Sequence, residues 1–80
     1  DPAILANYTG TYGSKDLPLK ITITEKNNEL IAQATGQSSF PLTFKEEKTF
    51  IFAPAGIEMI FGENSFVLKQ SGMSFNFSKE

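Results

Sequence analysis

Residues 39–61 read SFPLTFKEEKTFIFAPAGIEMIF, and this stretch decides the fold. Large apolar side chains recur at every second position on both sides of a charged break at residues 45–48. A period of two is typical of β-strands that bury one face. Residues 40–44, 50–52 and 57–61 are therefore predicted to form three strands that fold back on one another.

The same alternation continues toward both ends of the chain, and turn-forming residues separate the alternating segments. No segment shows a convincing 3.6-residue apolar period, so no helix is predicted among the strands. Residues 1–6 are expected to form a lead-in segment. The eight predicted strands cover residues 8–12, 19–24, 30–34, 40–44, 50–52, 57–61, 66–69 and 73–77.

Eight strands linked by hairpin-length loops would leave two exposed sheet edges, and closing the sheet removes both. We therefore expect residues 1–80 to form a single all-β domain. Its predicted architecture is an eight-stranded antiparallel up-and-down (meander) barrel of the lipocalin or streptavidin type. A two-layer sandwich is the alternative, although sandwiches usually need longer crossing connections than this sequence shows.

The shortest register of each hairpin predicts three layers of inward side chains. The first layer is almost wholly phenylalanine, with Phe44 opposite Phe50, Phe50 opposite Phe61, Phe61 opposite Phe66, and Phe66 opposite Phe77. An eight-stranded barrel is just wide enough for its side chains or one small ligand, so these layers predict a small, largely side-chain-filled interior. The other two layers contain Ile23, Ala32, Leu42, Phe52, Met59, Leu68 and Phe75, and Ile21, Ala34, Phe40, Pro54, Ile57, Gln70 and Met73.

One inward position is polar. Gln70 needs a hydrogen-bond partner if it points into the barrel. It either meets water or a turn at the rim, or serves as the polar contact of a shallow site for a small apolar ligand. The residues of this candidate ligand mouth are Ala34, Phe40, Ile57, Gln70 and Met73.

The outward face carries a second candidate site. The same register aligns Ile31, Thr43, Ile51, Ile60 and Val67 in one row across neighbouring strands. A contiguous apolar row can mark a docking surface, for a catalytic domain in the same parent chain or for a second copy. Ordinary β-propensity on a partly exposed sheet is the alternative explanation. The candidate docking row consists of Ile31, Ile51, Ile60 and Val67.

Composition excludes several classes of function. The net charge is −2 and the seven basic residues are dispersed lysines, so there is no electrostatic footprint for nucleic acid. The chain has no histidine and no cysteine, which removes the commonest general base and every thiolate ligand. Nucleophile and phosphate-loop motifs are missing, and no apolar run could span a bilayer. We therefore expect no catalytic residue, no metal site, no cofactor and no enzymatic activity.

The lead-in segment and the first predicted strand together carry the spacing Leu5-x-x-Tyr8-x-Gly10-x-Tyr12. An alternating strand follows, then Leu30, Phe50 and Phe61 on later strands, and the chain ends in an aromatic strand. This pattern resembles the small lipocalin-like C-terminal domain of unknown function found after serine hydrolases of the β-lactamase and penicillin-binding type.

The resemblance has one departure and several implications. Those domains often carry an aspartate shortly before the phenylalanine of the fifth strand, where this chain has Lys48 and Thr49. The family has no established catalytic residues in this domain, so none is carried over. The resemblance implies a bacterial, exported protein, periplasmic or extracellular. Its expected function is a non-enzymatic accessory or interaction barrel, appended to a hydrolase or free-standing. A binder of small hydrophobic ligands of the lipocalin type is the alternative.

Overall fold

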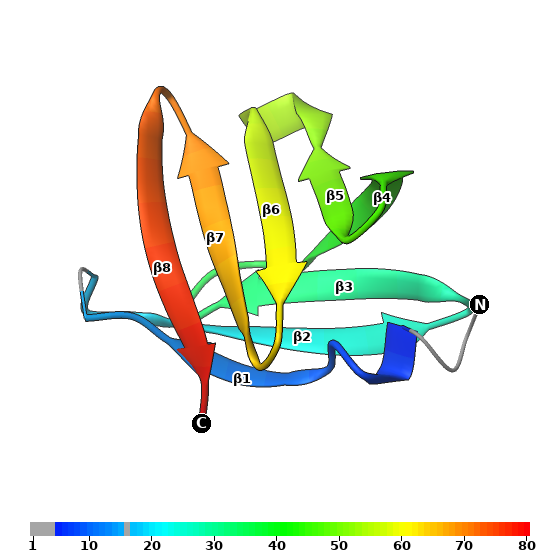
Figure 1. Cartoon of the computed structure of the whole chain (residues 1–80), viewed down its shortest axis with the longest axis horizontal. Coiled ribbons are helices and arrows are strands. Elements are labelled where there is room, and N and C mark those ends of the chain that lie inside the picture. The colour runs from blue at the N-terminus through cyan, green and yellow to red at the C-terminus, as the bar shows by residue number, and fades with distance from the viewer. Residues whose placement is uncertain (1–4, 16) are drawn as a thin grey trace.

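The computed structural model describes residues 5–15 and 17–80. Eight antiparallel strands follow one another in chain order and close into a barrel, which confirms the predicted meander topology (Figure 1). Each strand lies within two residues of its predicted bounds. The strands are β1 (Gly10–Gly13), β2 (Lys20–Lys26), β3 (Glu29–Ala34), β4 (Phe40–Glu46), β5 (Thr49–Phe52), β6 (Ile57–Gly62), β7 (Ser65–Gln70) and β8 (Met73–Lys79).

Several connections contain residues with positive φ, most of them asparagine or glycine. Asn27 and Asn28 form a two-residue turn with φ values of 53° and 66°. A two-residue hairpin turn with both φ values positive matches the twist of the flanking strands. The β5–β6 connection is longer and contains a 3-10 turn, η1 (Ala53–Ala55), that ends at Gly56 in the left-handed conformation. Leu5 and Ala6 are helical, while the rest of the predicted lead-in, residues 1–4, lies outside the described residues.

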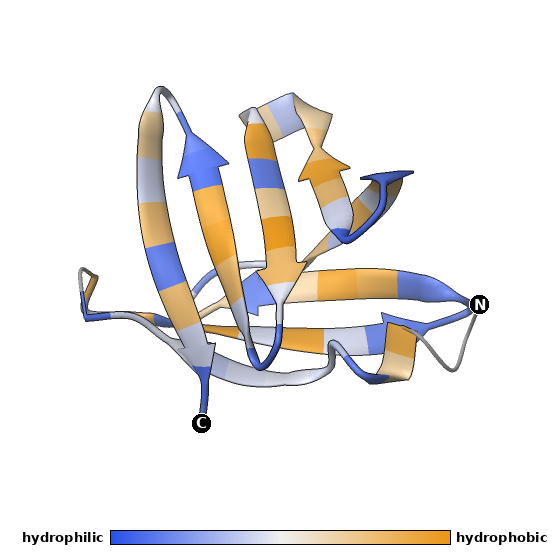
Figure 2. Ribbon diagram, in the orientation of Figure 1, coloured by the Kyte–Doolittle hydropathy of each residue, from blue (hydrophilic) through white to orange (hydrophobic). Residues whose placement is uncertain are grey.

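Hydrophobic residues recur along the strands between more hydrophilic ones (Figure 2), and most of the large apolar side chains on the inner face are buried. The ring of Phe66 stacks on that of Phe77, with the ring centroids 4.9 Å apart, and lies 5.2 Å from that of Phe61. Aromatic contacts of this kind stabilise a core beyond the burial of their area. The buried core consists of Tyr12, Ile21, Ile23, Leu30, Ala32, Leu42, Phe50, Met59, Phe61, Phe66, Leu68 and Phe77.

Two of the predicted registers are wrong. Phe50 lies opposite Met59 rather than Phe61, because η1 lengthens the β5–β6 turn and shifts the pairing by two residues. Leu42 lies opposite Leu30 rather than Ala32, because the β3–β4 connection also differs from the shortest hairpin. A shift of two residues keeps every side chain on its predicted face. The rings of Phe50 and Phe61 therefore still meet, edge to face, at 5.7 Å.

Three side chains assigned to the inward layers are exposed. Phe44 is 64% exposed and Met73 is 55% exposed. The barrel ends near both positions, so their inner sides have little to pack against. Pro54 is also exposed, because it belongs to η1 rather than to a strand.

The Tyr8-x-Gly10-x-Tyr12 spacing has a physical explanation in the way β1 meets β8. Gly10 has φ +143°, and a Cβ atom there would lie 3.1 Å from Cε of Lys79. Tyr12 is buried, and its hydroxyl donates a hydrogen bond to the backbone oxygen of Tyr8 at 2.8 Å. The ring of Tyr8 lies 4.7 Å from that of Phe61. The two tyrosines therefore help to close one end of the barrel.

Tyr12 is expected to make the stability of the barrel fall at high pH. Burial raises its pKa above the usual 10.0, and the nearby Tyr8 raises it further. The unfolded chain therefore loses this proton at a lower pH than the folded chain does. Its contribution to stability is complete below pH 10 and is lost as pH rises through the folded pKa. Urea unfolding at pH 8 and at about pH 11 should show a larger loss for the wild type than for Tyr12→Phe. Since the two proteins differ only in the hydroxyl group of residue 12, equal losses would contradict this assignment.

Candidate functional site

The predicted docking row is broken into shorter segments. Ile60 and Val67 lie directly opposite each other on β6 and β7. Ile51 lies opposite Glu58, two residues from Ile60, and is therefore its diagonal neighbour. Ile31 lies opposite Pro41 rather than Thr43, so the β3–β4 register separates it from the others. We refer to Ile51, Ile60 and Val67, which are all partly exposed, as the outer patch.

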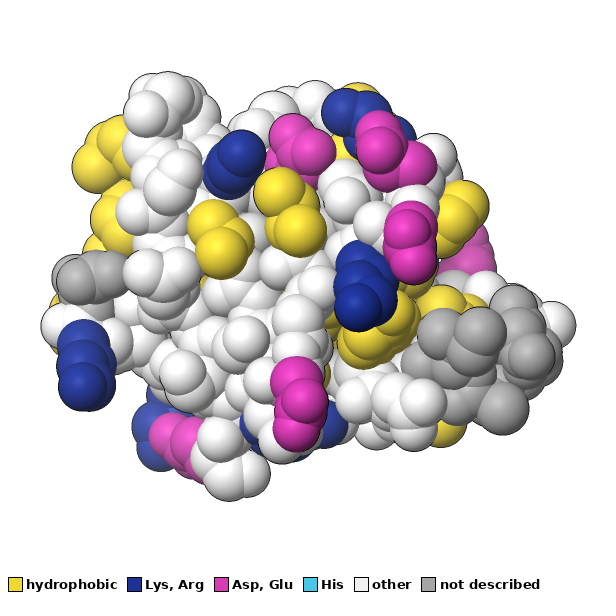
Figure 3. Space-filling view, in the orientation of Figure 1, with side chains coloured by type: hydrophobic (Ala, Val, Ile, Leu, Met, Phe, Trp, Pro, Cys, Tyr) yellow, Lys and Arg dark blue, Asp and Glu magenta, His cyan; other side chains and the backbone are white. Residues whose placement is uncertain are grey.

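Charged residues border the outer patch. Glu58 lies opposite Lys69 on the neighbouring strand, and its Oε2 is 3.7 Å from Nζ of Lys45. Figure 3 shows hydrophobic side chains in the middle of the face formed by β6 and β7, with charged side chains around them. An apolar centre with a polar border is the common anatomy of a non-obligate protein interface.

The five residues of the predicted ligand mouth occupy one end of the barrel, but most already have protein partners. The ring of Phe40 stacks on that of Phe52 at 4.6 Å, and Ala34 and Ile57 pack against the core. Nε2 of Gln70 donates a hydrogen bond to the backbone oxygen of Ala55 at 3.0 Å. Gln70 therefore meets a turn at the rim, as one of the two predicted alternatives has it. Met73 lies opposite Gln70 at the end of β8.

Two further concave sites formed by the described residues contain no residue of the predicted mouth. The first, the end pocket, has a volume of about 410 Å³ and lies at the opposite end of the barrel. The second, the side groove, is an open groove of about 970 Å³ between the β1–β2 connection and the end of β8. The end pocket is lined chiefly by Leu5, Leu30, Leu42, Phe44 and Phe50.

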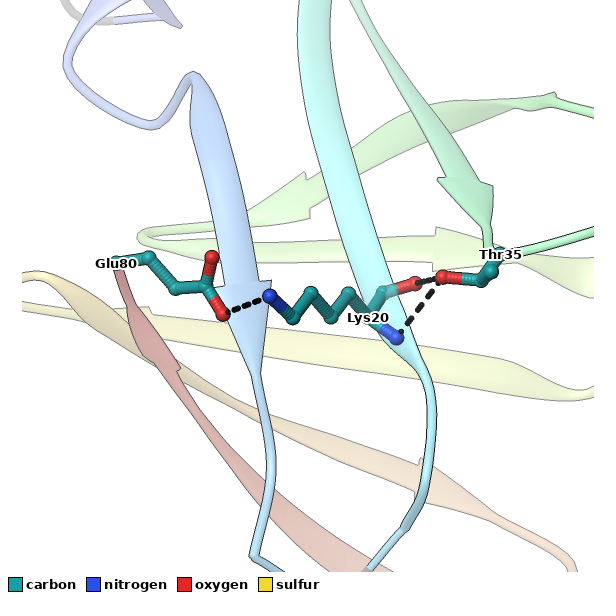
Figure 4. Close-up of polar contacts among 3 residues, drawn as sticks. All are labelled: Lys20, Thr35 and Glu80. Carbon is teal, nitrogen blue, oxygen red and sulfur yellow. Dashed lines mark hydrogen bonds and ion pairs between the residues drawn. The ribbon is translucent and has the colours of Figure 1, made fainter.

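An ion pair lies at the side groove (Figure 4). Nζ of Lys20 is 2.8 Å from Oε2 of Glu80, while the hydroxyl of Thr35 bonds to the backbone oxygen of Lys20 at 3.2 Å. The two charged side chains are 57% and 47% exposed, so the pair contributes little to stability. It holds residue 80 across β1, where the backbone N–H of Glu80 also bonds to the oxygen of Thr11 at 2.9 Å.

The chemistry of these surfaces is apolar contact and backbone hydrogen bonding. Within residues 5–15 and 17–80, no three His, Cys, Asp or Glu side chains gather where they could hold a metal ion. In the same residues no buried side-chain nitrogen or oxygen lacks a hydrogen-bond partner. No helix in the described part of the chain is long and apolar enough to cross a membrane.

The end pocket and the side groove could not be found from the sequence. Both depend on how far neighbouring strands overlap and on the path of connections. Phe44 was the one lining residue of the end pocket whose inward position the sequence stressed, through its place in the alternating pattern. The sequence did not show that the barrel ends there.

Comparison with protein-family models found no match, and neither did comparison with curated proteins or with solved structures. The link between the Leu5 to Tyr12 spacing and hydrolase-associated domains therefore stays a prediction.

Proposed function

We propose that this chain is a non-enzymatic interaction barrel that docks against another folded domain through the outer patch. One observation carries the proposal: Ile51, Ile60 and Val67 lie beside one another on the outside, although every large aromatic side chain except Phe44 is buried in the core or packed against it. Burying a fully exposed side chain of this size contributes roughly 1.5–3 kcal/mol, so even partial burial of three favours association.

The charges around the outer patch support recognition of a specific partner. Positive and negative charges both border the outer patch: Glu58 and Lys69 lie on its own strands, and Lys45 lies on the adjacent strand β4. Charges at the rim of an interface steer association and select orientation more than they add affinity. A partner with complementary charges around an apolar centre fits this arrangement.

The resemblance of the first strand names a candidate partner. It is the catalytic domain of a serine hydrolase of the β-lactamase or penicillin-binding type, carried in the same parent chain. In this proposal the barrel is an exported accessory module, and the chemistry belongs to the other domain.

Replacing Ile60 by lysine is expected to weaken such docking at least tenfold, because it puts a charge in the centre of the apolar patch. The measurement is a two-dimensional NMR titration of the labelled barrel with the domain encoded beside it in the full reading frame. Amide shifts should change along β5, β6 and β7. Thr22→Lys, at an exposed outward position of β2, is the matched control and should leave binding unchanged.

Two results would overturn docking. The first is a reading frame whose neighbouring domain does not perturb β5–β7. The second is equal binding by the Ile60→Lys and Thr22→Lys variants.

The end pocket supports small-ligand binding as a second candidate function. Its volume of about 410 Å³ falls in the range of known ligand sites, and its lining is mostly apolar. Titration with the apolar probe 1-anilinonaphthalene-8-sulfonate distinguishes the two functions. Changes in the NMR amide shifts of Leu30, Leu42 and Phe50, without changes at the outer patch, would favour ligand binding as the function.

A further inference from the structure

Strand β8 has a free edge. It pairs with β7 from Gln70↔Met73 to Ser65↔Ser78, but it meets β1 only at Ser78 and Lys79. Figure 1 shows β8 without a neighbouring strand on its other side until it reaches β1. Among the described residues, no strand therefore pairs with residues 73–77 on the side away from β7.

The backbone groups at this edge can be assigned from the turn before it. Ser71 and Gly72 form a two-residue turn with φ values of 54° and 77°, so Gln70 and Met73 make the closing hydrogen-bonded pair. Bonding to a neighbour alternates along an antiparallel strand. The N–H and C=O groups of Ser74 and Asn76 therefore point away from β7, toward the free edge.

This edge lacks the features that usually protect one. Residues 73–78 read MSFNFS and contain neither a charge nor a proline. Strand β4 also extends beyond its pairing with β3, at residues 43–46, but there it carries Lys45, Glu46 and a register shift. Lysines and bulges discourage edge-to-edge pairing, whereas an uncharged alternating edge is a template for another strand.

The edge is also open to a partner. Asn76 and Ser78 line the side groove, and both residues are exposed. Met73 is 55% exposed and Phe75 is partly exposed on the inner side of the same strand. A strand added here would gain backbone hydrogen bonds and apolar contacts together.

We propose that β8 pairs antiparallel with β8 of a second copy of this chain, about a twofold axis at Phe75. Ser74 then lies opposite Asn76 of the second copy, and both present outward-pointing backbone groups to each other. Phe75 lies opposite Phe75 of the second copy. Like charges opposite each other would weaken the pairing, and this register places none together. An isologous contact of this kind satisfies both free edges at once and stops at the dimer.

The interface is separate from the outer patch, because it uses backbone groups of β8 rather than side chains of β5–β7. One pair of short strands buries less than the roughly 800 Å² per partner of a standard interface. The dimer is therefore expected to be weak and to depend on protein concentration.

Sedimentation velocity between about 10 µM and 1 mM tests the proposal, in the range where weak dimers form. The apparent mass should rise from 8.8 kDa toward twice that value. Asn76→Pro removes an N–H that points to the free edge and leaves the β7 hydrogen bonds intact. It should weaken the dimer at least tenfold, whereas Asn76→Thr, which keeps the N–H, should not.

Hydrogen exchange on the wild type provides a second readout that does not depend on the folding of a variant. The amides of Ser74 and Asn76 should exchange more slowly at high concentration than at low concentration. The proposal would be overturned if the protein were monomeric at 1 mM, or if the exchange rates of these amides did not depend on protein concentration. So would a dimer that survives Asn76→Pro but is lost in Ile60→Lys, since that places the contact at the outer patch.

Discussion

Replacing Phe66 by alanine is expected to lower the free energy of unfolding by about 3–5 kcal/mol. Phe66 is 1% exposed, and its ring lies within 5.2 Å of the rings of Tyr12, Phe61 and Phe77. These neighbours sit on three other strands of the closed barrel, β1, β6 and β8, whose ladders hold them apart, so the cavity can shrink only in part. A domain of this length has a total stability of about 4–12 kcal/mol, and the variant should be close to unfolding at room temperature.

The same substitution at Phe44 is the matched control. Phe44 is 64% exposed, and its one aromatic contact is an edge-to-face approach to Phe50 at 5.7 Å. Its loss should cost less than about 1.5 kcal/mol. Urea unfolding followed by far-ultraviolet circular dichroism gives both values. Similar costs at the two positions would mean that the Phe66 ring does not lie in the closed interior.

The topology could be predicted because independent local signals agree on it. Alternation alone assigns the buried face of each strand, as in β2, where Ile21 and Ile23 are buried and their neighbours are exposed. The pairs Asn27-Asn28 and Ser71-Gly72 mark tight turns, and the positive φ values of Asn27, Asn28 and Gly72 follow from residue type. Closure follows because eight meandering strands would otherwise leave two long edges.

The registers across two connections could not be predicted. Residues 53–56 are compatible with a strand that continues to Pro54 and with a turn that begins at Ala53, and the chain adopts the second. A register shift of two residues leaves every side chain on the same face of the sheet. The alternating pattern therefore cannot distinguish the two registers. For this reason the residues of the predicted docking row do not form one continuous row, although each of them faces outward.

The free edge of β8 is a different kind of omission. It depends on how far β1 and β8 overlap, and the overlap is limited to Tyr12↔Lys79 and Gly13↔Ser78. Closing a barrel offsets neighbouring strands along the axis, and no local pattern reports the size of that offset. The uncharged sequence of residues 73–78 becomes informative only once the edge is known to be open.

Replacing Leu30 by alanine is expected to lower the free energy of unfolding by about 2–5 kcal/mol, the largest loss proposed here after that of Phe66→Ala. Leu30 is fully buried and lies opposite Leu42 in the β3–β4 ladder. That ladder contains only three residue pairs, Leu30↔Leu42, Ile31↔Pro41 and Ala32↔Phe40. Removing the leucine side chain therefore weakens the core where the barrel has few backbone bonds to compensate.

The adjacent substitution Ile31→Ala tests which face of β3 is inside. Ile31 points outward beside Pro41 and is partly exposed, so its truncation should cost about 1 kcal/mol or less. A slip of one residue in the strand would exchange the two environments, because successive side chains point to opposite faces. Thermal and urea unfolding of the two variants should then rank them in the opposite order. If Ile31→Ala proved the more damaging, the assignment of Leu30 and Ala32 to the interior of the barrel would be wrong.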